Sequence, residues 1–165
     1  MPAWNLSDDA LAQAPVIRDA RRDDVAAIVE LYRSDERSQK HDHAPGAPVP
    51  AGYYEVFDAI ERDARNRLLV VEVGGVAVGS FQVTLLLDMT PDARENLLVE
   101  NVIVAAPLRG RGIGEAMMRW AIDEGRRLGC SRVQLTSRET RADAHRFYER
   151  LGFEASHRGF RYVLD

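Results

Sequence analysis

A run of arginine and glycine at residues 109–114 (RGRGIG) has the residue types that bind an anion through the backbone. Glycine has no Cβ atom, so a ligand can approach the chain closely. An apolar stretch at 97–104 predicts a strand before this run, and a helical pattern starts at Ile113. The N–H groups at a helix start attract anions, and the guanidinium groups of Arg109 and Arg111 add charge. This chemistry suits a diphosphate.

Two known types of phosphate-binding loop fit this run less well. A P-loop carries Gly-Lys followed by Ser or Thr, and the run has no lysine. A dinucleotide-binding fingerprint has the spacing G-x-G-x-x-G, whereas Gly110, Gly112 and Gly114 give G-x-G-x-G. A flexible surface turn would also explain the glycines. The strand before the run and the helix after it favour the diphosphate site over such a turn.

Two polar residues, Glu100 and Asn101, interrupt the apolar strand at 97–104. A strand this apolar is expected to be covered on both faces, and consecutive side chains point to opposite faces. At least one of the two polar side chains would then be buried at a cost unless a cavity or a partner receives it. We therefore expect the Glu100 carboxylate to face a site. The alternative is a solvated carboxylate, or one paired with an arginine.

Hydropathy periodicity and turn residues predict the elements that hold these groups. The Gly74-Gly75 pair should join two strands as a hairpin. Strands are predicted over 16–20, 68–73, 76–86, 97–104 and 132–137, with two short strands in 153–164. Helices are predicted from Asp23, over 53–66, over 113–128 and from Thr140. The second helix should turn Val56, Phe57 and Ile60 inward, and Asp143 completes a capping-box pattern that starts at Thr140. This order predicts an α/β fold with a mixed sheet.

Glycines are expected to end two of these helices. Gly129 follows the helix over 113–128, and Gly152 follows the last helix. Each can adopt the left-handed conformation at a helix C-terminus, and Phe153 can supply the apolar contact that accompanies it.

The chain of 165 residues is expected to form one domain over 16–165, preceded by an extension over 1–15 that is poorly ordered. Trp4 and Leu6 could dock this extension on the domain or on a partner. The proline-rich segment 34–52 cannot form a regular helix, and a loop this long is either disordered or functional. His41 and His43 lie within it, but without further ligands we expect no metal.

Composition excludes several classes of protein. The chain has 22 Lys and Arg against 26 Asp and Glu, a net charge of −4, which disfavours a nucleic-acid partner. A single cysteine, Cys130, allows no internal disulfide and fits a cytoplasmic location. No signal peptide and no apolar run of membrane-spanning length is found, so we expect no membrane partner.

Two motifs together resemble a known family. Residues 109–114 resemble the [QR]-x-x-G-x-[GA] motif of the GNAT superfamily of N-acetyltransferases, and residues 144–153 (AHRFYERLGF) resemble its A-x-x-x-Y-E-x-x-G-F segment. One helix and one strand separate them, as in that family. The resemblance implies a GNAT-like fold, with a central mixed β-sheet flanked by about four helices and acetyl-CoA in a V-shaped gap between the strands at 97–104 and 132–137.

The resemblance also implies site residues. The cofactor-binding residues would be Val102, Ile103, Val104, Arg109, Gly110, Arg111, Gly112, Ile113, Gly114 and Arg141. Arg141 stands where the family often has an asparagine, so that contact is either replaced by a charged one or missing. Glu100 would act as general base through water, and Tyr148 as general acid near the thioester sulfur. A phenol with an ordinary pKa near 10 holds its proton at neutral pH.

We therefore expect an enzyme that acetylates a primary amine, most simply a small molecule, by direct attack in a ternary complex. A protein N-terminus or lysine is the second candidate acceptor. The sequence also leaves open a non-catalytic regulator that binds acyl-CoA and an interaction domain without cofactor. A homodimer follows by family analogy. His145 is expected at the surface or at the cofactor edge, and Arg126, Arg127 and Arg132 on a solvated face.

Overall fold

The computed structural model describes residues 4–35, 46–89 and 94–164. The chain divides into two compact units, Met1–Gln134 and Leu135–Asp165, and each is described by itself. The assignment of residues 16–165 to one domain stays a prediction.

A five-stranded sheet follows the order of the sequence, β1 to β5. Its strands are β1 (Val16–Asp19), β2 (Asn66–Val73), β3 (Val76–Leu86), β4 (Asn96–Val104) and β5 (Arg132–Leu135). Strands β1 to β4 pair antiparallel with their neighbours. Helix α4 (Ile113–Leu128) joins β4 to β5, which is the crossover connection that parallel neighbours need. The sheet is therefore mixed, as predicted.

The predicted hairpin between β2 and β3 is confirmed. Gly74 and Gly75 have φ of 58° and 77°, and two consecutive positive φ values are those of a type I′ turn. This turn matches the right-handed twist of the strands that it joins. The local sequence therefore determined where β2 ends and β3 begins.

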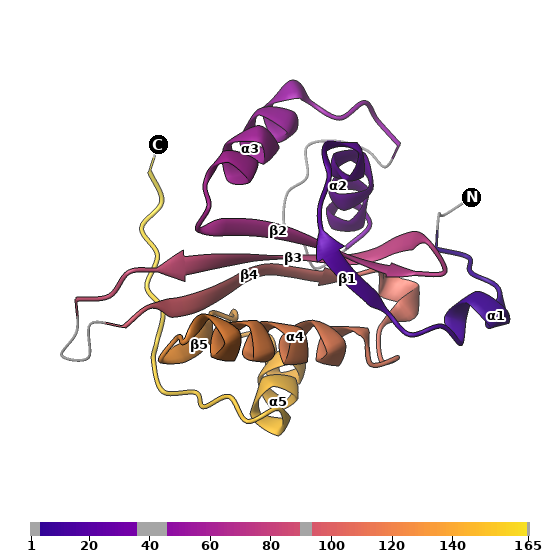
Figure 1. The fold of residues 1–165 in the computed structure, drawn as a ribbon. Helices are drawn as coiled ribbons and strands as arrows, with labels where there is room; N and C mark the ends of the chain where they lie inside the picture. The colour runs from indigo at the N-terminus through magenta and orange to yellow at the C-terminus, as the bar shows by residue number, and fades with distance from the viewer. Residues whose placement is uncertain (1–3, 36–45, 90–93, 165) are drawn as a thin grey trace. The chain divides into compact units, whose positions relative to one another are not determined.

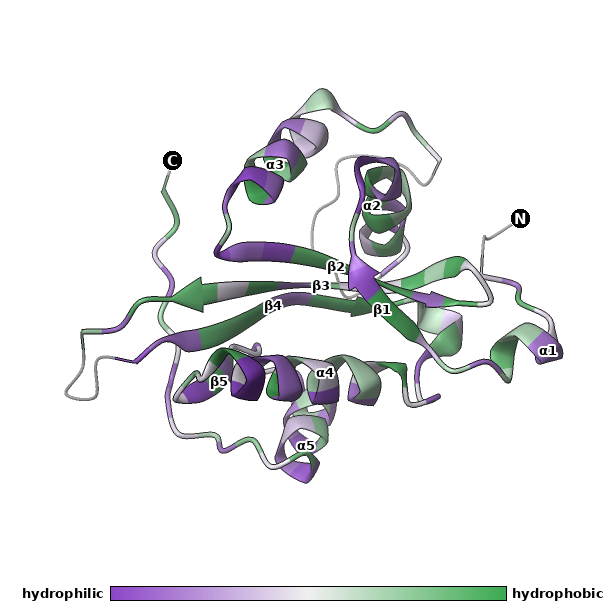
Figure 2. Ribbon diagram, viewed as in Figure 1, coloured by the Kyte–Doolittle hydropathy of each residue, from purple (hydrophilic) through white to green (hydrophobic). Residues whose placement is uncertain are grey.

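Helices cover both faces of the sheet in the first unit (Figure 1). Helices α2 (Val25–Arg33) and α3 (Ala51–Arg62) lie on one face, where Val25, Val29 and Phe57 form a buried cluster against Leu68 of β2. Helix α4 covers the other face, and the ring of Trp120 meets Phe81 of β3 edge-on. Figure 2 shows that β3 and β4 are mainly hydrophobic, as expected of strands between two helical layers.

Glycines end the last two helices as predicted. Gly129 (φ 74°) follows α4, and Gly152 (φ 93°) follows α5 (Ala142–Arg150). After α5, the N–H of Gly152 donates to the carbonyl of Glu149, and the N–H of Phe153 donates to that of Tyr148. The rings of Phe153 and Tyr148 are 5.9 Å apart. This is a Schellman motif with its apolar contact.

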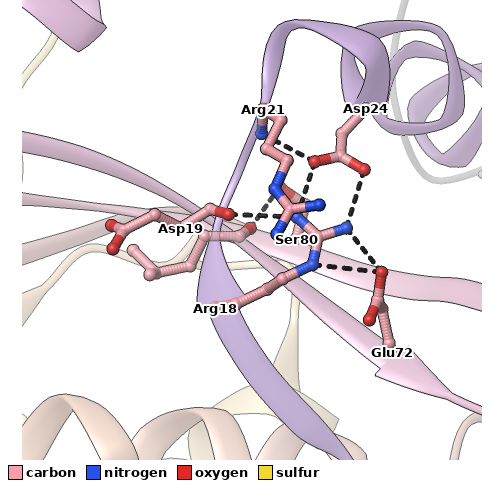
Figure 3. Close-up of polar contacts among 7 residues, drawn as sticks. Arg18, Asp19, Arg21, Asp24, Glu72 and Ser80 are labelled. Carbon is pink, nitrogen blue, oxygen red and sulfur yellow. Dashed lines mark hydrogen bonds and ion pairs between the residues drawn. The ribbon is translucent and has the colours of Figure 1, made fainter. Parts of the chain in front are cut away.

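Arg18 ties β1 to its neighbours. Its guanidinium donates to both carboxylate oxygens of Asp24, at 2.7 and 2.9 Å, and also to Glu72 on β2 (Figure 3). The hydrogen bond from Arg18 lowers the pKa of Asp24, against the opposing effect of burial. Asp24 ends the short 3₁₀ helix η1 (Arg22–Asp24) that leads into α2. The cluster therefore fixes the start of α2 on the sheet.

Two predicted helices have other bounds, and one predicted core residue is exposed. Helix α3 begins at Ala51, just after Pro50, so the end of the segment 34–52 is helical although no regular helix was expected there. Helix α3 ends at Arg62 rather than at residue 66, because the Asp63 carboxylate accepts from the backbone of Arg65 and from Asn66, and this local turn competes with the helix. Val56, expected inward, is 60% exposed. Helix α5 begins at Ala142, and its N-cap, Arg141, makes no side-chain cap bond, so Thr140 does not cap it.

The two ends of the chain also differ from expectation. The extension contains a helical turn, α1 (Asp8–Leu11), capped by the Ser7 hydroxyl. Trp4 is buried and donates from its indole N–H to the carbonyl of Ala77 on β3, so it docks on its own chain. The described tail, residues 153–164, contains no strand. A strand needs a partner to satisfy its backbone, and the residue pattern of the tail does not show whether such a partner lies beside it.

Candidate active site

Strand β4 carries a β-bulge next to Glu100. Ile103 pairs with Ser80 and Glu100 pairs with Gln82, so β4 has one more residue than β3 over this interval. The bulged stretch includes Asn101, which has a φ of 54°. Asparagine tolerates this left-handed conformation better than most residues, which explains why the bulge can form there.

The bulge exposes both polar residues of the strand. Glu100 and Asn101 are exposed, whereas Val99 and Ile103 beside them are buried. The prediction of strict alternation in a fully covered strand is therefore wrong at these positions. Glu100 lies opposite Gln82, which in turn pairs with Leu68, and Leu68 packs on the cluster under α2 and α3. The Glu100 side chain thus belongs to the sheet face that α2 and α3 cover.

The glycine run forms an open turn at the start of α4. Gly110 and Gly112 have φ of 77° and 81°, and a Cβ added at either would meet nothing within 4 Å. Gly112 is the N-cap of α4 and provides no side-chain cap, so the first-turn N–H groups of this 16-residue helix are not capped by it. The geometry is that of an anion site made from backbone groups.

The two arginines of the run differ. Arg109 donates from Nε to the carbonyl of Val104 at 3.1 Å and pairs with Asp35 at 3.0 Å. Its guanidinium therefore anchors the loop to the end of β4, and its charge already has a counter-ion. Arg111 is exposed. Of the two side chains, Arg111 has the freer charge for a phosphate.

The end of β4 extends past its short neighbour. Strand β5 has four residues and β4 has nine, and the backbone N–H of Ser131, just before β5, bonds to the carbonyl of Glu95, just before β4. Because β5 starts level with the start of β4, it is too short to run beside Val102–Val104. The V-shaped gap that the family resemblance implies between these two strands stays a prediction.

Tyr148 and Arg141 belong to the second unit. Tyr148 is half-buried on α5, with its ring 5.2 Å from that of Phe147. Burial raises the pKa of Tyr148, and the charge of Arg141 partly opposes this, so the phenol stays protonated at neutral pH. The buried Nε of Arg141 has no hydrogen-bond partner among the described residues. That these two residues approach Glu100 stays a prediction.

The histidine, the three arginines and the cysteine that the sequence analysis named make local contacts or are unreactive. His145 lies within hydrogen-bonding distance of the carbonyl of Arg138, at 3.0 Å. The three arginines expected on a solvated face are exposed and paired: Arg126 with Asp123, Arg127 with Glu124, and Arg132 with Asp88. Burial raises the pKa of the Cys130 thiol, which disfavours a reactive thiolate.

Two predicted absences concern metal ions and membranes. His41 and His43 lie outside the described residues. In the part of the chain that the structure describes, no group of three or more His, Cys, Asp or Glu could hold a metal ion. The same part has no helix long and apolar enough to cross a membrane.

Sequence reasoning missed Tyr32 and Gln82. The helical pattern places Tyr32 on the packed face of its helix, but its hydroxyl donates to the carbonyl of Asn101 at 2.8 Å. Gln82 has no distinguishing feature in the sequence, yet it faces Glu100 across the pairing of β3 and β4. No local pattern could have identified them, because 69 residues separate Tyr32 from Asn101.

Comparison with known proteins places this geometry in a family. Residues 23–153 match the Acetyltransferase (GNAT) family. The chain belongs to the GNAT acetyltransferase family. The matched region contains strands β2 to β5, the glycine turn before α4 and the segment that ends at Phe153, which confirms the family that the two motifs predicted.

Individual relatives agree with this assignment. The chain is 38% identical over 66 residues to aminoalkylphosphonate N-acetyltransferase of Salmonella typhimurium, covering 40% of this chain and 43% of that protein. It is 38% identical over 79 residues to N-alpha-acetyltransferase 80 of Mus musculus, covering 48% and 23%. This chain thus spans less than half of either relative.

A solved structure resembles nearly the whole chain. The crystal structure of a transcriptional regulator from Bacillus halodurans C-125 superposes with a TM-score of 0.86 and 34% identity, over 92% of this chain and 100% of that one. The fold described above is therefore found in a crystal structure, along almost its full length.

Proposed function

We propose that this chain transfers the acetyl group of acetyl-CoA to a primary amine of a small molecule, by direct attack in a ternary complex. The observation that carries the proposal is the open glycine turn at the uncapped start of α4, directly after a strand whose bulge exposes Glu100. One segment thereby combines an anion site with a carboxylate that water can reach.

The residues fit the cosubstrate at three points. The N–H groups of residues 110–114 can hold the pyrophosphate, because the turn leaves open space where side chains would otherwise stand. The backbone of Val102–Val104 can pair with the pantetheine arm as an added strand would. Arg141, with a buried and unpartnered Nε among the described residues, can take a further polar group of the cosubstrate.

The acid and base roles follow from which groups must lose or gain a proton during acetyl transfer. The acceptor arrives as an ammonium, and Glu100 takes its proton through water so that the nitrogen lone pair is free. The nitrogen–carbon bond forms and the carbon–sulfur bond breaks. Tyr148, which its raised pKa keeps protonated, gives its proton to the departing thiolate, and the second proton that the nitrogen loses as the amide forms re-protonates Tyr148.

The proposed acceptor is a small amine because the relative from Salmonella typhimurium is named for a small amine substrate. A protein N-terminus or lysine is the second candidate, which the resemblance to an N-alpha-acetyltransferase favours.

A regulatory module without catalysis is the third candidate. The structural relative from Bacillus halodurans is named a transcriptional regulator. Such a module would need the cosubstrate site but neither the base nor the acid, and this chain has both Glu100 and Tyr148. A cytoplasmic homodimer without nucleic-acid, membrane or metal partners remains our prediction for the protein as a whole.

The deciding experiment is calorimetric titration of the full chain with acetyl-CoA, CoA, dephospho-CoA and pantetheine, of which only pantetheine lacks the pyrophosphate. We expect Kd values for acetyl-CoA of about micromolar order, typical of an enzyme cosubstrate, and loss of binding when the pyrophosphate arm is removed, as in pantetheine. Thiol release with a panel of amines and peptides would then separate the acceptor classes. Absence of binding by every CoA species would overturn the proposal.

A further inference from the structure

Asn101 is held in a conformation that side chains rarely adopt. Among the described residues it alone combines a side chain with a positive φ, and its φ is 54°. It lies in the bulge of β4, directly after Glu100. A backbone of this kind persists only where surrounding contacts hold it, so those contacts are part of how the strand is built.

Tyr32 holds Asn101 from the helix above the sheet. Its hydroxyl, on α2, donates to the Asn101 carbonyl at 2.8 Å. Burial raises the pKa of Tyr32 well above its ordinary value, so the phenol remains a donor. Helix α2 is itself fixed by the buried residues Val25 and Val29. The hydrogen bond therefore joins the bulge to a well-packed element.

Gln82 holds the side chain of Asn101 from the neighbouring strand. The Asn101 amide donates to Oε1 of Gln82 at 3.4 Å, a long bond, and the Gln82 amide donates to Oδ1 of Asn66 at 3.1 Å. Asn66 in turn donates to the carboxylate of Asp63 at 2.7 Å. Because an ionised carboxylate can only accept, it fixes the direction of each amide in this chain of hydrogen bonds.

We propose that Tyr32, by holding the Asn101 carbonyl, is a positioning residue that sets the direction of the Glu100 carboxylate. The proposal deepens the function proposed above and rests on it. The carbonyl that Tyr32 holds belongs to the peptide between Asn101 and Val102. Without this hydrogen bond the backbone of Asn101 could leave its positive φ, and the strand would then present the preceding side chain, Glu100, in another direction. A base must lie within hydrogen-bond reach of its proton or of one bridging water, and small displacements reduce the rate strongly.

The test is a double-mutant cycle with Tyr32→Phe and Glu100→Gln, measured by thiol release. We expect Tyr32→Phe to lower kcat about 10- to 100-fold, while Kd for acetyl-CoA stays within about twofold. In the Glu100→Gln background, Tyr32→Phe should have almost no further effect, because its role passes through Glu100. A merely structural loss would lower the rate by the same factor in both backgrounds, and that result would overturn the proposal.

Tyr54→Phe is the matched control. Tyr54 lies on α3 and packs on the buried cluster of the same sheet face, and no hydrogen bond of its hydroxyl is found among the described residues. The kcat of the Tyr54→Phe variant should equal that of the unmodified chain. Equal losses in Tyr54→Phe and Tyr32→Phe would show that any hydroxyl removed from this face has the effect, which contradicts the proposal.

A second pair of variants tests the backbone directly. Asn101→Gly and Asn101→Val both remove the carboxamide, but glycine accepts a φ of 54° and valine does not. Asn101→Gly should keep kcat within about fivefold, and Asn101→Val should lose at least as much as Tyr32→Phe. Equal activity of the two would overturn the idea that the bulge conformation directs Glu100.

Failure of this inference can be told from failure of the proposed function. If Glu100→Gln has full activity, the base assignment is wrong, and Tyr32 then has nothing to position. If Glu100→Gln is impaired but the cycle is additive, the base assignment stands and the positioning role alone falls. If the unmodified chain does not bind acetyl-CoA, both the proposed function and the positioning role of Tyr32 are wrong.

Discussion

Glu100 is exposed on a strand whose neighbouring positions are largely buried, so water and an ammonium group can reach its carboxylate. The base is needed most where the acceptor is fully protonated and least where the free amine is already present. Glu100→Gln should therefore lower kcat/KM about 10²- to 10⁴-fold near pH 7, with a smaller loss near pH 9. Kd for acetyl-CoA should change little. Undiminished turnover between about pH 6 and pH 9 would remove Glu100 from the mechanism.

Tyr148 is the residue whose protonation the proposed leaving-group step requires. Burial raises its pKa, so the protonated form persists through neutral pH and is lost only as the pH rises through that higher value. Tyr148→Phe should lower kcat about 10- to 100-fold at neutral pH, with Kd for acetyl-CoA unchanged. Steady-state kinetics and calorimetry measure the two quantities separately. Tyr162→Phe, on the exposed tail, is the control, and an unchanged kcat in Tyr148→Phe would leave that residue a packing role only.

At the scale of the element, the proposed cosubstrate site depends on the start of α4. Gly112→Val would place a branched side chain at a φ of 81°, in the space where the backbone should meet the pyrophosphate. We expect it to weaken acetyl-CoA binding by about 100-fold or more, as measured by calorimetry.

Gly129→Val supplies a control at the other end of the same helix. Gly129 has a φ of 74° and equally open surroundings, so the backbone strain is similar and each substitution should cost about 1–2 kcal/mol of stability. Only Gly112→Val should lose binding. Equal loss in both variants would mean that binding fails through instability, and retained binding in Gly112→Val would place the phosphate site elsewhere.

The junction of β1, η1 and β2 depends on the charges around Arg18. The pKa of Asp24 is lowered in the folded state, so this carboxylate stabilises the fold above its unfolded pKa near 3.8, and the contribution is lost as the pH falls through the lower folded value. Asp24→Asn should reduce the free energy of unfolding by about 1–3 kcal/mol at pH 7.

Urea unfolding at several pH values measures this effect. The difference between Asp24→Asn and the unmodified chain should shrink below about pH 4, where the carboxylate of the latter becomes protonated. Asp58→Asn is the control, since the Arg22–Asp58 pair is mostly exposed and such pairs contribute less than about 1 kcal/mol. A difference that stays constant down to about pH 2 would contradict the electrostatic account.

At the scale of the whole molecule, the tail after α5 carries large apolar side chains that are exposed. Phe160, Tyr162, Val163 and Leu164 are 91%, 89%, 69% and 84% exposed. An exposed run of large apolar residues marks an interaction surface. This exposure supports the predicted homodimer.

Sedimentation equilibrium tests that prediction at the scale of the assembly. The unmodified chain should have twice the mass of one chain, and the triple variant Phe160→Ser, Tyr162→Ser, Leu164→Ser should shift toward the monomer. Arg158→Ser and Arg161→Ser, on the same tail, are polar controls that should remain dimeric. A monomeric unmodified chain at about 100 µM would remove the homodimer prediction.

Much of the fold could be predicted because its determinants are local. Gly74-Gly75 accommodates positive φ at both positions and so fixes the hairpin; Gly129 and Gly152 end helices for the same reason. The glycine run before Ile113 predicted both the start of α4 and the open turn there. Local patterns were misleading at the end of α3. There the hydrogen bonds to the Asp63 carboxylate compete with the helix, and the hydropathy pattern predicted an end at residue 66 instead of Arg62.

The candidate site was predictable only in part. The identity of Glu100 as the polar residue of an apolar strand is a property of the sequence, but its exposure depends on a bulge that exists only where β4 pairs with β3. The hydrogen bond from Tyr32 to Asn101 and the contact of Trp4 with Ala77 join residues about 70 positions apart. The conformations of the turn glycines and the C-terminal ends of α4 and α5 are decided within a few residues, so the sequence determined them. Strand register and long-range hydrogen bonds depend on which surfaces meet, so only the tertiary structure decided them.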